Sequence, residues 1–187
     1  MRALPLFALG IIGAAEGVAA LDRHRARHVL YEQAKQQAAD LGRPLVVVGD
    51  PDSGAHTSLV RAYGCGDVCI DLRGCGSCPR AITTDITRII PLPTDSSVVF
   101  VSCVLEYVAD PQATWAEILR VAGSPDNVFL ARVQPWTLTA ALYPGARWTI
   151  ERRDGAIDQT PVTDGRKIAS LGVIAALAAW AVWPRRA

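Results

Sequence analysis

Short apolar runs alternate with amphipathic stretches through the middle of the chain. The segments 45–48 and 98–102 are largely apolar, rich in β-branched residues, and flanked by turn residues. Such runs are typical of strands that are buried on both faces, as in a parallel sheet covered by helices. The segment 111–121 places Trp115, Ile118 and Leu119 on one helical face. This alternation predicts an α/β domain with a doubly wound, mostly parallel sheet.

Weaker patterns predict the remaining elements of this domain, which are strands over 67–72, 127–133 and 147–152 and helices over 56–63 and 137–143. The strand over 147–152 is expected at an edge of the sheet. Before the domain, neither glycine nor proline interrupts residues 22–41 until Gly42. This predicts a helix that ends there and that is nearly continuous with the apolar segment before it.

Apolar residues are concentrated at the two ends of the chain. Residues 3–21 are almost entirely apolar, and as a helix they approach the roughly 30 Å of a bilayer core. Arg2 precedes this run, whereas Arg23, Arg25 and Arg27 follow it. A signal peptide is the alternative. The heavier positive charge after the run favours an uncleaved anchor, with the folded domain on the cytoplasmic side.

A second apolar run occupies 168–183, with Trp180 and Trp183 near its end, as in the aromatic belt of membrane segments. It is short for a spanning helix, so a core or interfacial helix is the alternative to a second membrane segment. The expected organisation is a membrane anchor at 1–21, a helix and linker at 22–44, the α/β domain at 45–152, a polar linker at 153–167 and a C-terminal membrane segment at 168–183.

Five cysteines are present, and four of them lie between positions 65 and 78. An odd number with irregular spacing argues against a secreted disulfide framework, so a reducing compartment is expected. The clustered residues Cys65, Cys69, Cys75 and Cys78 are a candidate zinc-ligand set, and a Cys75–Cys78 redox pair is another alternative. Their spacing differs from standard zinc knuckles, and Cys69 falls inside a predicted strand. Buried free cysteines are favoured, and no metal site is predicted.

Candidate ligand-binding residues follow the predicted strands. In doubly wound sheets, ligands bind outside the carboxyl ends of the strands. The loop from Gly49 to Gly54 follows the first strand, and Asp71 closes the second strand about twenty residues further on. Backbone N–H groups of this loop suit an anionic group, and the carboxylate of Asp71 suits ribose hydroxyls. The pattern indicates a nucleoside-containing ligand.

A longer motif extends this pattern, in the order Thr84-Asp85-Ile86, Pro91-Leu92-Pro93, the strand 98–102, Val104-Leu105-Glu106-Tyr107 and Glu117-x2-Arg120-Val121. In order and spacing it resembles the small class I S-adenosylmethionine-dependent methyltransferases, over about residues 45–148. The resemblance implies a Rossmann-like methyltransferase fold, here truncated at the C-terminal hairpin and carrying apolar terminal helices.

The resemblance also implies roles for individual residues in binding S-adenosylmethionine. The Gly49 to Gly54 turn would lie beside the methionine moiety, Asp71 would bind the ribose, and Leu72 would lie against the adenine. Asp85 would accept from the adenine amino group. The implied cofactor-binding residues are Gly49, Asp50, Asp52, Gly54, Asp71, Leu72, Asp85, Ile86, Ser102 and Cys103. No catalytic residue is assigned, and Glu106 and Arg120 are expected to form a structural ion pair or a solvated face.

The first loop departs from the family pattern, because Val48, Asp50 and Asp52 stand where an acidic residue and two glycines are expected. Two functional hypotheses follow. The first is a membrane-associated methyltransferase that transfers a methyl group from S-adenosylmethionine to an unknown acceptor. The second is a non-catalytic module of the same fold, serving as a structural or interaction subunit of a membrane assembly. An open pocket at the first loop favours the enzyme, and a pocket filled by its Asp side chains favours the module.

The expected partners follow from the apolar ends and from the charge. The apolar ends predict contacts with membrane lipid and with other membrane-protein subunits. The net charge of +1 gives no electrostatic indication of nucleic-acid binding.

Overall fold

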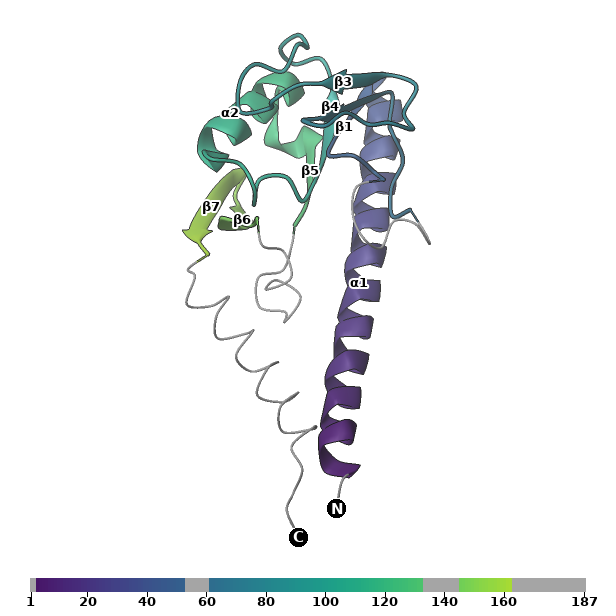
Figure 1. The fold of residues 1–187 in the computed structure, drawn as a ribbon. Helices are drawn as coiled ribbons and strands as arrows, with labels where there is room; N and C mark the ends of the chain where they lie inside the picture. Colours follow the sequence, from purple (N-terminus) through teal and green to yellow (C-terminus); the bar gives the residue numbers. More distant parts are fainter. Residues whose placement is uncertain (1–2, 53–60, 133–144, 163–187) are drawn as a thin grey trace.

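The computed structural model describes residues 3–52, 61–132 and 145–162, and for residues 3–17, 19 and 20 it describes the backbone alone. Five parallel strands form the central sheet in the order β3-β2-β1-β4-β5 (Figure 1). These strands are β1 Leu45–Val48, β2 Val68–Asp71, β3 Ala81–Thr83, β4 Val98–Ser102 and β5 Val128–Ala131. The prediction of an α/β domain with a parallel sheet is confirmed.

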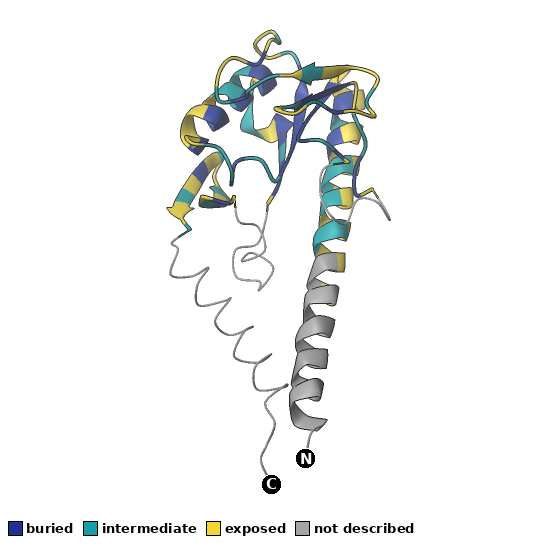
Figure 2. Cartoon of the chain, viewed as in Figure 1, coloured by how far each residue is buried: buried dark blue, intermediate teal, exposed yellow. Residues whose placement is uncertain are grey.

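Different helices cover the two faces of the sheet. Val46 of β1 belongs to the buried cluster that includes Ile118 of α2 (Pro111–Ala122). Val47, which points to the opposite face, belongs to the cluster that includes Ala34 of α1 (Ala3–Leu41). Figure 2 shows the buried residues concentrated in the strands and on the sides of the helices that face them. Burial of β1 on both faces explains why its four residues are all apolar.

α1 is one uninterrupted helix of 39 residues, about 58 Å long at 1.5 Å per residue. Its C-terminal part packs against the sheet, and its N-terminal part extends beyond it (Figure 1). The helix predicted over 22–41, and its continuity with the segment before it, are confirmed. α1 ends before Gly42, whose φ of 61° lies in the left-handed region that glycine favours at helix ends.

The first predicted membrane segment is described almost only as backbone, and the second is not described. Within the part of the chain whose side chains are described, no helix is long and apolar enough to cross a membrane. The predicted anchor at 1–21 coincides with the start of α1, where only the side chains of Val18 and Leu21 are described. The segment 168–183 lies entirely outside the described residues, as does the helix predicted over 137–143.

α2 has the capping residues that its sequence indicates. The side chain of Asp110 accepts hydrogen bonds from the backbone N–H groups of Gln112 and Ala113, and Pro111 occupies the first turn. Gly123 ends the helix with a φ of 73°. A Cβ at this position would lie 1.8 Å from Oδ1 of Asp95. Both caps fix the helix at the bounds that the apolar spacing predicted.

The Glu117-x2-Arg120 motif of α2 ties the helix to the segment before β4. Nη2 and Nη1 of Arg120 donate to the carbonyl oxygens of Ile90 and Leu92 at 3.0 Å. Glu117 accepts from Nη2 of Arg120 at 2.7 Å and from the backbone N–H of Ile90 at 2.7 Å. Arg120 therefore forms a structural ion pair, as expected, but its partner is Glu117, one helical turn away, and not Glu106.

Two short elements differ from the sequence predictions. The strand expected over 147–152 is not an edge of the main sheet, because β6 (Trp148–Arg153) pairs antiparallel with β7 (Ala156–Pro161) in a separate hairpin. Part of the segment predicted as a linker, 153–167, therefore forms a strand. Nε1 of Trp115 donates to the carbonyl oxygen of Gly155 at 3.2 Å, which holds this hairpin against α2.

The loop regions hold the other differences. β3 has only three residues and was not predicted. Most of the helix expected over 56–63 lies outside the described residues, and its last three residues, 61–63, are not helical. A 3-10 turn, η1 (Pro125–Asn127), precedes β5.

We expect Arg120→Leu to lower the free energy of unfolding by about 1.5–3 kcal/mol, the usual range for hydrogen bonds to a charged group. The substitution removes the donor to two backbone carbonyl groups and the partner of Glu117. Urea denaturation monitored by circular dichroism measures the effect. The matched control is Arg153→Leu, since Arg153 pairs with Glu151 on the exposed hairpin, and its effect should stay within about 0.5 kcal/mol. Equal losses in both variants would contradict the role of Arg120.

Candidate functional site

A pocket of about 560 Å³ lies at the carboxyl ends of the parallel strands. This volume falls within the range of roughly 300–1,000 Å³ that is usual for small-molecule sites. It lies where the chain order of the sheet reverses between β1 and β4, the location of ligand sites in doubly wound folds. Its lining comes from the ends of β1 and β2 (Val48, Gly49, Ile70–Arg73), the loop after β3 (Thr84–Thr87), the segment after β4 (Cys103, Val104, Tyr107–Ala109) and Arg147.

Gly49 brings the ends of β1 and β4 together on one side of this pocket. Its φ is 106°, and a Cβ at this position would lie 2.8 Å from the backbone oxygen of Ser102. The N–H of Gly49 donates to the carbonyl oxygen of Ile70 on the other neighbouring strand at 2.9 Å. The position therefore requires glycine for both backbone conformation and space.

The carboxylate of Asp71 organises the backbone at the end of β2. Oδ2 accepts from the N–H of Asp50 at 3.1 Å, and Oδ1 accepts from the N–H of Arg73 at 2.8 Å. Asp71 thus links the first loop to its own loop and also lines the pocket. A carboxylate has about four acceptor sites, so these two hydrogen bonds leave capacity for a ligand hydroxyl.

Asp85 and two apolar side chains form the next part of the lining. Oδ1 of Asp85 accepts from the N–H of Thr87 at 3.0 Å and from its Oγ1 at 2.7 Å. These bonds lower the pKa of Asp85, which is therefore ionised at neutral pH. Leu72 is 66% exposed although it is a large apolar residue, whereas Ile86 is buried. Both contribute to the same pocket.

Cys103 lies at the end of β4 with a φ of 52°, which is unusual for a non-glycine residue. Nη2 of Arg27, a residue of α1, donates to its Sγ at 2.8 Å. Burial raises the pKa of the Cys103 thiol to about 11, although the charge of Arg27 acts in the opposite direction. The thiol is therefore protonated at neutral pH and is a poor nucleophile.

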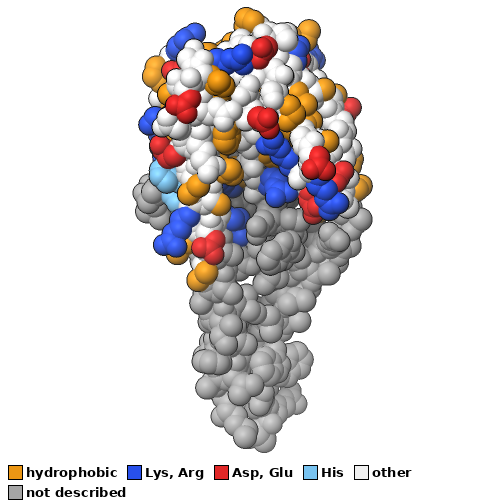
Figure 3. Space-filling model, turned by 180° about the vertical axis from the view of Figure 1, so that it is seen from behind, with side chains coloured by type: hydrophobic (Ala, Val, Ile, Leu, Met, Phe, Trp, Pro, Cys, Tyr) orange, Lys and Arg blue, Asp and Glu red, His pale blue; other side chains and the backbone are white. Residues whose placement is uncertain are grey.

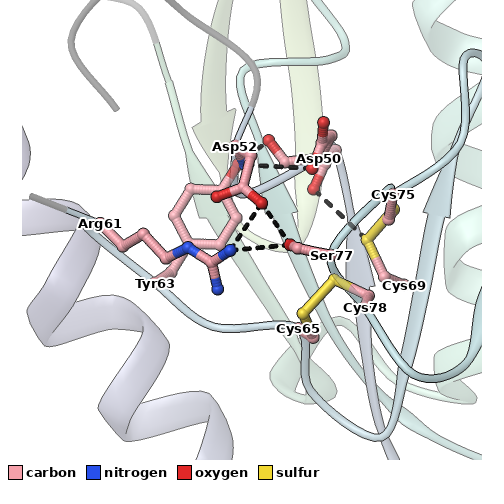
Figure 4. Close-up of polar contacts among 10 residues, drawn as sticks. Asp50, Asp52, Arg61, Tyr63, Cys65, Cys69, Cys75, Ser77 and Cys78 are labelled. Carbon is pink, nitrogen blue, oxygen red and sulfur yellow. Dashed lines mark hydrogen bonds and ion pairs between the residues drawn. A yellow bond between two sulfur atoms is a disulfide. The ribbon is translucent and has the colours of Figure 1, made fainter. Parts of the chain in front are cut away.

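The Asp side chains of the first loop do not fill the pocket. Nη2 of Arg61 donates to Oδ2 of Asp52 at 2.6 Å and to Oγ of Ser77 at 2.7 Å, and Ser77 also donates to Asp52 (Figure 4). The hydrogen bond from Ser77 lowers the pKa of Asp52. The hydroxyl of Tyr63 donates to the carbonyl oxygen of Asp50 at 3.1 Å, and burial raises the pKa of Tyr63 to about 12. These contacts hold the loop, and neither Asp50 nor Asp52 is part of the pocket lining.

The ten residues implied by the methyltransferase resemblance fall into four groups. Six of them line the pocket, namely Gly49, Asp71, Leu72, Asp85, Ile86 and Cys103. Asp50 and Asp52 support the loop, and Ser102 is buried in β4. Gly54 lies outside the described residues.

Arg147 belongs to the lining although no local pattern indicated it. Its N–H donates to the carbonyl oxygen of Glu106 at 2.8 Å, which brings the start of β6 to the segment after β4. Glu106 itself is only 1% exposed and lies near Cys103, whose pKa it helps to raise. Arg73, Tyr107 and the two threonines at 84 and 87 were also missed, although each follows a strand end where lining residues are expected.

The cysteines differ from the sequence prediction. Disulfides join Cys65 to Cys78 and Cys69 to Cys75, and Cys103 is free. The expectation of buried free cysteines is therefore wrong for four of the five, and the alternative Cys75–Cys78 pair is not formed. The two disulfides also overturn the argument for a reducing compartment, which rested on the absence of a disulfide framework. Cys69 lies in β2, but the loop that follows the strand returns to it, and this proximity was not apparent from spacing.

The exposed surface gives no sign of a highly charged partner on the face that Figure 3 displays. Acidic and basic side chains are interspersed over the described part of this face. A nucleic-acid surface would show a continuous basic patch instead.

No protein-family model, curated protein or solved structure matches the chain.

We expect Gly49→Ala to destabilise the protein by more than about 1 kcal/mol, because alanine is strained at positive φ and its Cβ would meet a backbone oxygen. Gly76→Ala is the matched control, since nothing lies within 4 Å of a Cβ there. Thermal denaturation of both variants compares the two sites. A Gly49→Ala protein as stable as Gly76→Ala would contradict the close approach of β1 and β4.

We expect Arg27→Gln to slow alkylation of Cys103 by iodoacetamide in the oxidised protein. The guanidinium lowers the pKa of the thiol, so its removal raises the pKa and reduces the thiolate fraction at any pH below it. The pH profile of the reaction should shift toward higher pH. Arg25→Gln, an exposed position on the same helix, should leave the profile unchanged. Faster alkylation of Arg27→Gln would mean that Arg27 shields the thiol rather than activating it.

Proposed function

We propose that this pocket binds S-adenosylmethionine and that the chain is a membrane-associated methyltransferase-like protein acting on an unknown acceptor. The observation that carries the proposal is the convergence of six of the implied residues on one pocket at the strand ends. They come from four separate segments of the chain. An open pocket beside the first loop also favours the enzyme over the module, because the side chains of Asp50 and Asp52 are not part of the lining.

The described lining suits the nucleoside part of this cofactor. Asp71 offers carboxylate oxygens to ribose hydroxyls, with its position fixed by two backbone N–H groups. Leu72 and Ile86 offer apolar surface to the adenine ring, which would explain why a large apolar residue is exposed at position 72. Asp85 is held by Thr87 and ionised, and so is an acceptor for the adenine amino group.

The end of β4 suits the reacting end of the cofactor. S-adenosylmethionine supplies an electrophilic methyl group, and its transfer is a direct displacement in which positioning matters more than a strong acid or base. Cys103, Val104 and Tyr107 border this part of the pocket. Because the thiol of Cys103 is protonated at neutral pH, it does not compete with the acceptor for the methyl group.

α1 supports the membrane association. Arg23, Arg25 and Arg27 follow the apolar run, and this charge favours an anchor with the domain on the cytoplasmic side, whereas the two disulfides favour an oxidising compartment. From the same helix, Arg27 contacts Cys103, which lines the pocket. Membrane lipid and other membrane-protein subunits are the proposed partners, and an acceptor that resides in or at the bilayer fits this arrangement.

The second candidate is the non-catalytic module. One observation favours it, since both carboxylate oxygens of Asp71 already accept hydrogen bonds within the protein. In this case Asp71 would serve only to close the first loop, and the pocket would have no cofactor.

Calorimetric titration of S-adenosylmethionine into the full-length chain in detergent tests the proposal. We expect saturable binding that Asp85→Asn weakens by tenfold or more, equal to about 1.4 kcal/mol. Asn keeps Oδ1 for Thr87 but replaces the other acceptor by a donor, so the loop is retained while the contact with the adenine amino group is lost. Asp40→Asn is the matched control, because Asp40 is an exposed carboxylate of α1 outside the pocket.

The two outcomes separate the candidates. Binding that Asp85→Asn weakens and Asp40→Asn preserves supports the cofactor site. Absence of heat at millimolar cofactor, from protein with the circular dichroism spectrum of a folded α/β domain, would exclude the enzyme and leave the module.

A further inference from the structure

The two disulfides lie side by side on the α1-facing side of β2 (Figure 4). The sulfur atoms of Cys69, Cys75 and Cys78 all lie within 4.8 Å of one another, although Cys78 belongs to a different disulfide from the other two. The sulfur of Cys65 is bonded to that of Cys78. Four sulfur atoms from three backbone segments are therefore gathered in one small volume.

Three of the four sulfur atoms already lie close to the spacing of a tetrahedral zinc site, and the fourth, that of Cys65, is bonded to one of the three. Zinc–thiolate bonds of about 2.3 Å place the four sulfur atoms roughly 3.8 Å apart. Reduction of the two disulfides would free each bonded pair of sulfur atoms to separate to this distance. Cys69 and Cys75 are 0% and 2% exposed, so the site is closed to water on one side, as structural zinc sites are.

The backbone around the cluster suits both ligation and small shifts. Cys75 and Cys78 have the spacing of two residues that is usual for zinc ligands, and their turn is closed by the N–H of Cys78 donating to the oxygen of Cys75 at 3.0 Å. Gly76 lies inside this turn with nothing within 4 Å of a Cβ. Apart from Cys69 in β2, the cysteines lie outside helices and strands, so they can move without breaking the sheet.

The surrounding charge also favours a thiolate centre. A zinc ion with four thiolates carries a net charge of −2. Arg61 lies beside the turn, with Nη2 donating to Oγ of Ser77 at 2.7 Å (Figure 4). Arg73 and Arg80 flank the same turn in the sequence. Arg61 also pairs with Asp52 at 2.6 Å, so Arg73 and Arg80 are the cations that would offset more of the negative charge.

We propose that Cys65, Cys69, Cys75 and Cys78 form a redox-switched zinc site, with two disulfides in the oxidised protein and a zinc tetrathiolate in the reduced protein. Each disulfide accepts two electrons and two protons from one dithiol reductant, which itself becomes a disulfide. The four protein thiols then bind one Zn²⁺ and release four protons. Both states cross-link the same loop, so the fold is retained across the change.

The switch would act on the neighbouring pocket. Asp71, Leu72 and Arg73 lie between Cys69 and Cys75 in the sequence and line that pocket. The sulfur of Cys69 lies 3.9 Å from the carbonyl oxygen of Gly49. Replacement of the two disulfides by one metal centre would therefore change the contact between the Cys69 sulfur and the backbone of Gly49, where the first loop begins. Zinc binding itself does not depend on the methyltransferase proposal.

Cobalt titration of the reduced full-length chain tests the site. The protein in detergent is reduced anaerobically with a phosphine, which provides no thiols to compete for metal, and reduction is verified by thiol counting. We expect the visible and sulfur-to-metal absorption bands of tetrahedral cobalt thiolate, saturating at one equivalent of Co²⁺. One equivalent of Zn²⁺ should remove these bands, because zinc occupies thiolate sites more tightly than cobalt.

Two variants make the test specific. Cys103→Ser removes the free cysteine and should retain the full cobalt spectrum. The double variant Cys65→Ser/Cys78→Ser keeps the buried Cys69–Cys75 disulfide, so its fold can be verified in the oxidised state, and after reduction it should lose the tetrathiolate spectrum. Absence of the spectrum from reduced wild-type protein would overturn the proposal. Disulfides that resist reduction in the native protein, or a spectrum that survives the double variant, would overturn it as well.

Discussion

The close contact between the ends of β1 and β4 determines where this protein can bind a ligand. β1 is buried on both faces, and at its carboxyl end Gly49 approaches the backbone of Ser102 more closely than any side chain would permit. After Gly49, the backbone N–H of Asp50 donates to Asp71 at the end of β2. The pocket lies beside the contact between β1 and β4. Asp71 stabilises the opening by accepting from the N–H groups of loops on either side. The pocket is therefore a consequence of sheet topology, and its chemistry is set by the residues that follow each strand.

Elements with strong apolar patterns were predictable from the sequence, and elements defined by distant contacts were not. β1, β4 and α2 agree with the predictions because continuous apolar runs and apolar residues at helical spacing are local signals. β3 has three residues with exposed side chains at both ends, so it carries no apolar pattern. The β6–β7 hairpin depends on contacts with α2, such as that of Trp115 with Gly155. The disulfides depend on a loop that returns to β2, which cysteine spacing alone does not reveal.

The site residues show the same division. The first loop, which begins at Gly49, and Asp71 were indicated by their place after predicted strands, whereas Leu72, Asp85, Ile86 and Cys103 were indicated only by the methyltransferase resemblance. All six line the pocket. Asp50 and Asp52 follow a strand end too, but a turn points Asp52 toward Arg61 and Ser77. Arg147 reaches the pocket only through the carbonyl oxygen of Glu106. Glu117 took the partner expected for Glu106, because a carboxylate three residues before Arg120 on the same helix is the nearer one.

α1 connects the proposed membrane anchor directly to the pocket. It is uninterrupted from Ala3 to Leu41, and the rise from Leu21, at the end of the apolar run, to Arg27 is about 9 Å at 1.5 Å per residue. Arg27 contacts Cys103, which borders the proposed reacting end of the cofactor. No flexible linker separates the two functions, so an anchored α1 would hold the pocket within one or two helical turns of the bilayer surface. A soluble acceptor gains nothing from this proximity, whereas an acceptor embedded in the bilayer requires it, and for this reason we favour a membrane-associated acceptor.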